Sequence, residues 1–289
     1  MRLHTFILTL TAILFSCQGN KPSASIQEND LIFLPRDREI VEDALARFGE
    51  PAKTDPGNMM VRVARFFLET PYVAQTLEVS DTEKLVVNLR EMDCTTFAET
   101  SLALTRTLRS KNPGFERFTS ELEKIRYRGG IRNGYPSRLH YFSDWIHDNE
   151  QKGIVKNVSQ EIAHIVVPNQ VNFMSTHYQS YPALKTHPEL ISQIVLQEYA
   201  ISNRKCWYIP RNKLPEFESK LHDGDILGIT TAIEGLDVSH VVIAWRINGK
   251  IRFIHASQKE NKVVVSKETL VEYLKGSKLA TGIMVARPL

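Results

Sequence analysis

The sequence predicts an α+β fold in which N-terminal helices pack on a C-terminal antiparallel β-sheet. Apolar residues recur at helical spacing through the first half of the chain, to about residue 153. Short, β-branched apolar segments separated by Gly, Asn-Gly and Pro follow in the second half. Helices first and strands later are typical of α+β folds. Since no linker separates the two halves, we expect one domain after the N-terminal leader.

The composition is that of a globular protein. The 289 residues are 42% hydrophobic and 24% charged, which suffices for a large core. The net charge of +3 is scattered, and no basic stripe indicates a nucleic-acid surface. We therefore expect no nucleic-acid partner, and the composition leaves the oligomeric state open.

The N-terminus has the pattern of an export signal. Residues 1–17 carry one Arg, an apolar run too short to span a membrane, and then Ser16 and Cys17. "LFSC" resembles a bacterial lipobox, which implies an acylated Cys17 on an exported, periplasmic, membrane-anchored protein. A plain secretory signal is the alternative. Residues 18–35 are polar and predict a flexible spacer before a domain over 36–289.

The first half of the chain shows helix starts and stops in order. Acidic residues early in a segment and a Gly or Pro after it mark helix ends. This pattern predicts helices at residues 37–49, 58–70, 94–110, 114–127 and 138–153, whereas 82–93 is ambiguous between strand and helix.

The second half is strand-rich. The predicted strands are 154–163, 164–170, 205–210, 224–231, 239–257 and 282–289, with a helix or connector at 187–203. The Asn248-Gly249 pair inside 239–257 predicts a two-residue hairpin turn. If Ala244 to Arg246 faces Lys250 to Arg252, His240 lies opposite His255 or a neighbour of it.

Cys94 stands at a predicted helix start, in "EMDCTTFAET". The partial positive charge of a helix N-terminus favours a thiolate, so Cys94 is a candidate nucleophile. Asp93 before it is either the helix cap or a ligand for a substrate amine. Cys206, beside Trp207, predicts an unpaired core thiol, and a disulfide between Cys94 and Cys206 is the alternative.

A nucleophilic cysteine needs a base and a group that orients the base. Among nine histidines, His240 and His255 stand out because they fall on adjacent predicted strands. The alternative is two unrelated strand-end histidines with local hydrogen bonds. The remaining histidines show no compact ligand spacing, and no CxxC or HExxH motif is present, so we expect no metal and no cofactor.

The segments "DC", "DGDIL", "SHVVIAW" and "FIHAS", in this order, resemble the NlpC family of papain-like cell-wall cysteine hydrolases. The resemblance implies a papain-like fold in which Cys94 is the nucleophile, His240 the base and His255 the orienting residue. "TPYVAQTLE" is similar to the family's Gly-x-Pro-Tyr segment, with Thr70 in place of the Gly. That similarity implies that Tyr72 lines the site and helps to hold the oxyanion.

Residues 113–212 form an insertion that is long for this family. The insertion resembles the branch of N-acetylmuramoyl-L-alanine amidases, which implies cleavage between muramic acid and L-alanine in peptidoglycan fragments. Anhydro-muropeptides would be substrates if the enzyme serves cell-wall recycling. Three alternatives stay open: a γ-D-glutamyl-diaminopimelate endopeptidase, a non-catalytic peptidoglycan-binding lipoprotein, and an acyltransferase on the same scaffold.

The insertion concentrates Arg, His and aromatic residues around glycines. Arg128 and Arg138 are candidates to bind substrate carboxylates through bidentate hydrogen bonds. His140 and Tyr141 are candidates to line the site, and Tyr141 can stack on a sugar or peptide face. For Trp145 we favour a place in the core.

Overall fold

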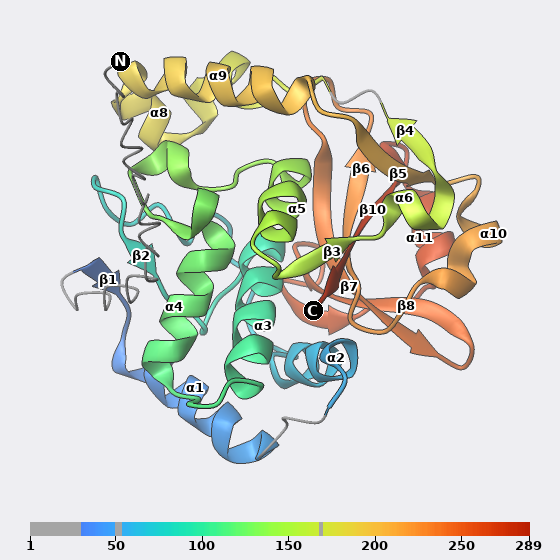
Figure 1. Ribbon diagram of the computed structural model, residues 1–289, viewed down its shortest axis with the longest axis horizontal. Helices are drawn as coiled ribbons and strands as arrows, with labels where there is room; N and C mark the ends of the chain where they lie inside the picture. The colour runs from blue at the N-terminus through green and yellow to red at the C-terminus, as the bar shows by residue number, and fades with distance from the viewer. Residues whose placement is uncertain (1–29, 50–53, 168–169) are drawn as a thin grey trace, which may run out of the picture.

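The computed structural model describes residues 30–49, 54–167 and 170–289. Its helices and antiparallel sheet confirm the predicted α+β class (Figure 1). The predicted signal peptide, Cys17 and residues 18–29 of the predicted spacer lie outside the described residues. None of the helices in the described part is long and apolar enough to cross a membrane.

An antiparallel sheet of eight strands forms the second half of the fold. Its strand order is β4-β5-β10-β6-β7-β8-β9, and β3 also pairs with β10. The strands are β3 (Val155–Asn157), β4 (Ile165–Val167), β5 (Cys206–Pro210), β6 (Ile226–Thr231), β7 (Val238–Ile247), β8 (Lys250–Ser257), β9 (Lys262–Val265) and β10 (Ala280–Pro288).

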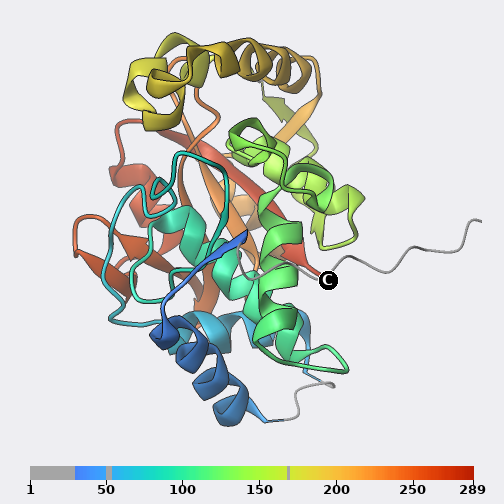
Figure 2. The ribbon, with the colours of Figure 1, turned by 90° about the vertical axis from the view of Figure 1, so that its left-hand side faces the viewer.

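Helices cover both faces of this sheet. On one face lie α1 (Pro35–Phe48), α2 (Pro56–Phe66), α3 (Cys94–Leu108), α4 (Phe115–Arg126) and α5 (Phe142–Gln151) (Figure 2). The later helices are α6 (Ser159–Ala163), α7 (Phe173–Thr176), α8 (Pro182–Thr186), α9 (Ile191–Ser202), α10 (Leu214–Phe217) and α11 (Leu270–Gly276). Short 3-10 turns are η2 (Arg128–Gly130), η3 (Tyr135–Ser137), η4 (Tyr178–Ser180), η5 (Pro188–Leu190) and η6 (Glu218–Lys220).

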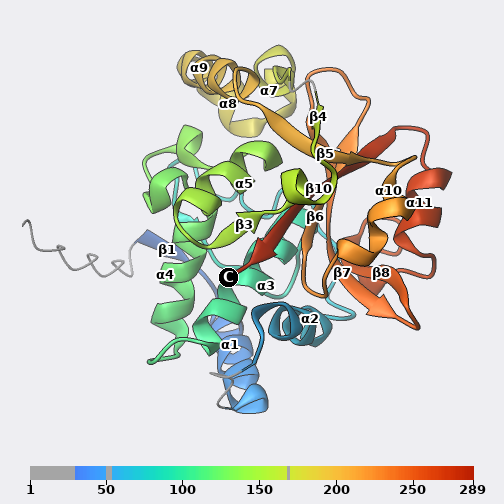
Figure 3. The same cartoon turned by 45° about the vertical axis from the view of Figure 1, so that its right-hand side comes forward.

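The core has two main parts because the inner strands are apolar on both faces. Val241, Ile243 and Ile254 point toward the first group of helices and are buried with α3 at the centre. Val242 and Phe253, which alternate with them, belong to a second apolar cluster. Helices α10 and α11 cover that second face (Figure 3). Helix α3 is thereby fixed against β7 and β8.

The predicted hairpin is present, but its register differs by one residue from the expected one. Ile247 pairs with Lys250, and Asn248 and Gly249 form the two-residue turn with φ of 51° and 79°. Positive φ at both central residues matches the right-handed twist of the strands. Continued to the strand ends, this register makes His255 a diagonal neighbour of His240 on the same face of the pair.

Three other expectations need correction. The predicted spacer ends too late, because Leu31–Ile32 forms β1 and pairs in parallel with β2 (Leu85–Val86), inside the ambiguous segment. The predicted strand 154–163 is half strand and half helix, since Ser159–Ala163 is α6. The predicted insertion, expected to consist of helices and loops, also adds strands to the main sheet, because β3 and β5 both pair with β10.

A buried ion pair joins α3 to α4. Arg126 Nε donates to Glu99 Oε2 at 2.7 Å, and Arg126 Nη1 donates to the Val86 carbonyl at 2.7 Å. Both charged side chains are only 4% exposed. Removing one partner of such a pair leaves the other charge buried without compensation.

We expect Arg126→Ala to lower the free energy of unfolding by about 3 kcal/mol, because the Glu99 carboxylate stays buried. Arg36→Ala is the matched control, since Arg36 forms an exposed pair with Glu39 whose loss costs about 0.5 kcal/mol or less. Urea denaturation followed by circular dichroism measures both. Equal effects of the two substitutions would contradict this assignment.

Candidate active site

Cys94 lies where two strands of the sheet separate. The ladder between β7 and β8 ends at the pair Ile243–Ile254, although both strands continue beyond it. The N-terminus of α3 meets the sheet at this gap, and the Val241 backbone N–H donates to the Cys94 sulfur. The thiol is therefore held at a strand end, at the first residue of a helix, and is partly buried.

His240 and His255 form the central contact of the site. His240 Nε2 lies 2.7 Å from His255 Nδ1, within hydrogen-bond distance, and the two rings meet edge to face. The predicted pairing of these two histidines is therefore present in the structure. His240 also lines the same small hollow as Cys94.

The protonation of this pair follows from its surroundings. Burial, followed by the neighbouring His255, lowers the pKa of His240 to about 3. Burial likewise lowers the pKa of His255 to about 4, against an opposing effect of Glu260. Both imidazoles are neutral at pH 7, so one hydrogen lies between them. His240 can accept a proton at Nδ1 only if its Nε2–H donates to His255 Nδ1.

Burial favours a protonated Cys94 thiol at rest, in opposition to the helix N-terminus, which favours the thiolate. Burial, and then the negative charge of Asp93, raises the pKa of Cys94 to about 11. Hydrogen bonds from the Val241 N–H, the Thr95 hydroxyl and the backbone N–H of Cys94 itself act in the opposite direction but do not outweigh burial. Cys94 and His240 therefore rest as a neutral thiol and a neutral imidazole.

Tyr72 lies beside Cys94, as the sequence resemblance implied. Its backbone N–H donates to the Asn261 carbonyl, and it forms a parallel bridge with Met92. Burial and the nearby charges of Cys94 and Asp93 raise the pKa of the Tyr72 phenol. Its hydroxyl is thus protonated, and it has no hydrogen-bond partner among residues 30–49, 54–167 and 170–289.

Several predicted substrate-binding residues are already engaged by the protein itself. Asp93 Oδ1 accepts the Thr96 N–H at 2.8 Å, so Asp93 is the cap of α3. Three more candidates are bound to acidic side chains. Arg128 pairs with Asp144 at 2.7 Å, and Tyr141 donates to Glu198 at 2.7 Å. Arg138 pairs with Glu78 at 2.5 Å and with Glu83 at 2.7 Å. These contacts favour structural roles over substrate contact.

His140 lies in the site region instead. It lines the small hollow with Cys94, and its Nε2–H donates to the Tyr135 carbonyl at 3.1 Å. Burial, and then the charge of Arg138, lowers the pKa of His140 to about 3, so it is neutral. Trp145 is 2% exposed and stacks on Phe142, which agrees with a place in the core at the wall of this hollow.

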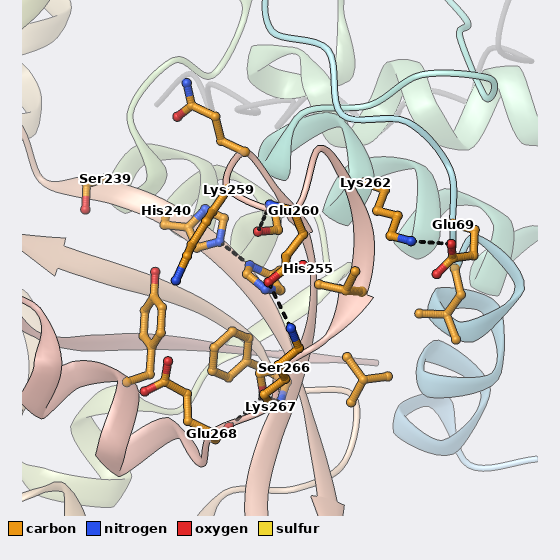
Figure 4. Close-up of a pocket in the computed structure, with 17 residues that line it drawn as sticks. Glu69, Ser239, His240, His255, Lys259, Glu260, Lys262, Ser266, Lys267 and Glu268 are labelled. Carbon is orange, nitrogen blue, oxygen red and sulfur yellow. Dashed lines mark hydrogen bonds and ion pairs between the residues drawn. The ribbon is translucent and has the colours of Figure 1, made fainter.

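Two hollows meet at His240. The smaller, of about 90 Å³, contains Cys94 and His140 in its wall. The larger, of about 870 Å³, is lined by His240 and His255 together with three lysines and three glutamates (Figure 4). His240 therefore borders both hollows.

The sequence analysis did not single out three polar residues of the larger hollow, namely Lys259, Glu268 and Tyr273. Tyr273 comes from α11, which was not predicted, and its raised pKa reflects burial, then Glu268 and Cys94. Thr269 and Glu272 form a capping box at the start of α11, and this pattern is visible in the sequence. No comparable sequence pattern marks Lys259, which lies in the β8–β9 turn.

No group of three or more His, Cys, Asp or Glu side chains in the described part of the chain is arranged to hold a metal ion. Cys206 is a free thiol like Cys94, 3.7 Å from the Met284 sulfur. Burial and Asp237 raise the pKa of Cys206 to about 12, so it is a poor nucleophile. The structure thus favours the core-thiol interpretation over a disulfide.

Comparison with known proteins places the chain among amidase-like proteins. A family model described as AmiA-like, N-acetylmuramoyl-L-alanine amidase-like, matches residues 62–283. This match spans most of the chain, which therefore belongs to the AmiA-like family. No curated protein matches it.

Solved structures agree with this family. An N-acetylmuramoyl-L-alanine amidase from Bacteroides uniformis is 39% identical, with a TM-score of 0.78, over 81% of this chain and 99% of that one. A "putative xylanase" from Bacteroides fragilis is 42% identical, with a TM-score of 0.75, over 78% and 99%. Protein LPG0564 from Legionella pneumophila, 21% identical with a TM-score of 0.65 over 88% and 93%, shows the fold alone.

Alkylation of Cys94 by iodoacetamide tests its protonation. Only the thiolate reacts, so with a pKa of about 11 the rate rises about tenfold per pH unit through neutral pH, without a plateau. Mass spectrometry of the Cys94 peptide measures this rate, and Cys206 in the same sample is the internal control. A rate already constant from mildly acidic pH would indicate a resting thiolate–imidazolium pair and contradict the neutral assignment.

Proposed function

We propose that this chain is a cysteine amidase of the papain-like NlpC type. It hydrolyses the amide bond between N-acetylmuramic acid and L-alanine in peptidoglycan fragments, including anhydro-muropeptides released for recycling. The observation that carries this proposal is the 2.7 Å contact between His240 and His255, with Cys94 across the same small hollow. The AmiA-like family supports the type of bond.

His240 acts as the general base. Its Nε2 is engaged by His255, whereas its Nδ1 has no hydrogen-bond partner among the described residues. As the Cys94 sulfur attacks the carbonyl carbon, the thiol proton passes to Nδ1 of His240. The imidazolium is stabilised by its hydrogen bond to His255 Nδ1, which also keeps the ring oriented.

The oxyanion that forms meets donors at the start of α3. The Cys94 backbone N–H belongs to the first turn of the helix and has no partner within α3. The Tyr72 hydroxyl is a second donor next to Cys94. Donors fixed in place before reaction stabilise developing negative charge efficiently. His240 then returns its proton to the leaving nitrogen as the C–N bond breaks, and water hydrolyses the thioester.

A glycosidase mechanism fits this site poorly. Glycoside hydrolysis uses two carboxyl groups that flank the scissile bond. In the small hollow the carboxylate is Asp237, and its two oxygens accept the Ser143 and Val238 N–H groups, each at 2.7 Å. Asp237 thus holds the start of α5, and within the small hollow the thiol and the imidazole remain as the reactive groups.

The sequence of residues 1–17 supports a periplasmic location for this activity. An export signal ending in a lipobox cysteine would place the enzyme in the periplasm, attached to a membrane through a lipid on Cys17. A single lipid chain binds membranes weakly and reversibly, so two or more acyl chains on Cys17 would be needed for stable attachment.

Mass spectrometry of products from defined muropeptides tests the proposal. Wild-type protein should release a free stem peptide that begins with L-alanine, together with the sugar. Cys94→Ala should lose this activity by at least about 1,000-fold, because no residual nucleophile remains. Cys206→Ala is the matched control and should retain full activity.

The other outcomes separate the alternatives. A stem peptide cut internally would keep the chemistry and replace the proposed bond by the γ-D-glutamyl-diaminopimelate bond. Transfer of the acyl group to an added amine would indicate an acyltransferase. No cleavage by folded wild-type protein would contradict the amidase and favour a peptidoglycan-binding protein.

A further inference from the structure

The larger hollow lies on the leaving-group side of the reaction, given the proposed function. The acyl carbon is bonded to the Cys94 sulfur in the intermediate, and Cys94 lines the smaller hollow. The leaving nitrogen takes its proton from His240, and His240 and His255 line the larger hollow. The peptide released from the amide must therefore extend into the larger hollow, whose 870 Å³ suits a short peptide.

Charged side chains surround this hollow in equal numbers of each sign. Four of these side chains form two ion pairs: Lys262 contacts Glu69 at 2.5 Å, and Lys267 contacts Glu260 at 3.3 Å. Lys259 and Glu268 remain, and neither has an ion-pair partner in the described part of the chain. The hollow thus offers one free cation and one free anion.

These two free charges lie on different segments of the wall. Lys259 is in the β8–β9 turn beside His240, and Glu268 comes just before α11. Figure 4 shows their side chains pointing toward one another across the hollow. The Glu268 backbone carbonyl accepts the Ser266 hydroxyl at 2.8 Å, which fixes the main chain and leaves the carboxylate free.

We propose that Lys259 and Glu268 bind a zwitterionic amino-acid group of the leaving peptide, Lys259 its carboxylate and Glu268 its ammonium. In a stem peptide the fitting group is the side-chain end of diaminopimelate, where one carbon carries both charges. A lysine at that position has the ammonium and lacks the carboxylate. The pair therefore selects diaminopimelate-type over lysine-type peptides.

Calorimetric binding of free peptides to wild-type protein tests this selection without any turnover. The probes are L-Ala-γ-D-Glu-diaminopimelate, the same peptide with lysine, and the first peptide acetylated on its side-chain amine. We expect the first to bind about two- to fivefold more tightly than the other two, as for an exposed ion pair, because both side chains are exposed. Lys259→Ala should remove the preference for the diaminopimelate peptide over the lysine peptide. Glu268→Gln should remove its preference over the acetylated peptide.

Matched exposed residues away from the hollow serve as controls. Lys278→Ala and Glu42→Gln remove the same charges elsewhere and should leave all three affinities unchanged. Equal affinities of wild type for the three peptides, or an equal loss for all three in Lys259→Ala, would overturn the inference. So would absence of binding by any peptide. Failure to cleave muropeptides would instead contradict the proposed function, since this assay involves no cleavage.

Discussion

The hydrogen bond between His240 and His255 is the interaction on which the chemistry of this site depends. A neutral imidazole has one N–H, and the 2.7 Å contact determines which nitrogen keeps it. In the proposed mechanism, Nε2–H is directed to His255, and Nδ1 of His240 takes the proton of Cys94. The register between β7 and β8 positions this contact. The ends of the two strands separate where the N-terminus of α3 meets the sheet.

Burial sets a second constraint, because it disfavours every charged form in the site. It raises the pKa of Cys94 to about 11 and lowers that of His240 to about 3. In the proposed mechanism, Cys94 therefore loses its proton only as it attacks a bound carbonyl, and the Tyr72 hydroxyl meets the charge that develops on the carbonyl oxygen. A resting neutral thiol also reacts slowly with oxidants.

The sequence predicts the parts of the site that depend on local patterns. The Asn248-Gly249 pair predicted the hairpin, and Asp93 predicted the helix start at Cys94. The features that the sequence could not show depend on tertiary environment. Burial opposes a thiolate at Cys94, and Arg138 is paired with Glu78 and Glu83, which precede it by many residues. Pairing across such distances leaves no local pattern in a single sequence.

The most direct test of this account is the tautomer of His240, measured by ¹⁵N–¹H NMR of the imidazole nitrogens at neutral pH. The account predicts a neutral ring with hydrogen on Nε2 and a free Nδ1 in the resting enzyme. In His255→Phe, which removes the acceptor, the Nε2–H preference should be lost. A protonated Nδ1, or an imidazolium at neutral pH, would contradict the role given to the histidine pair.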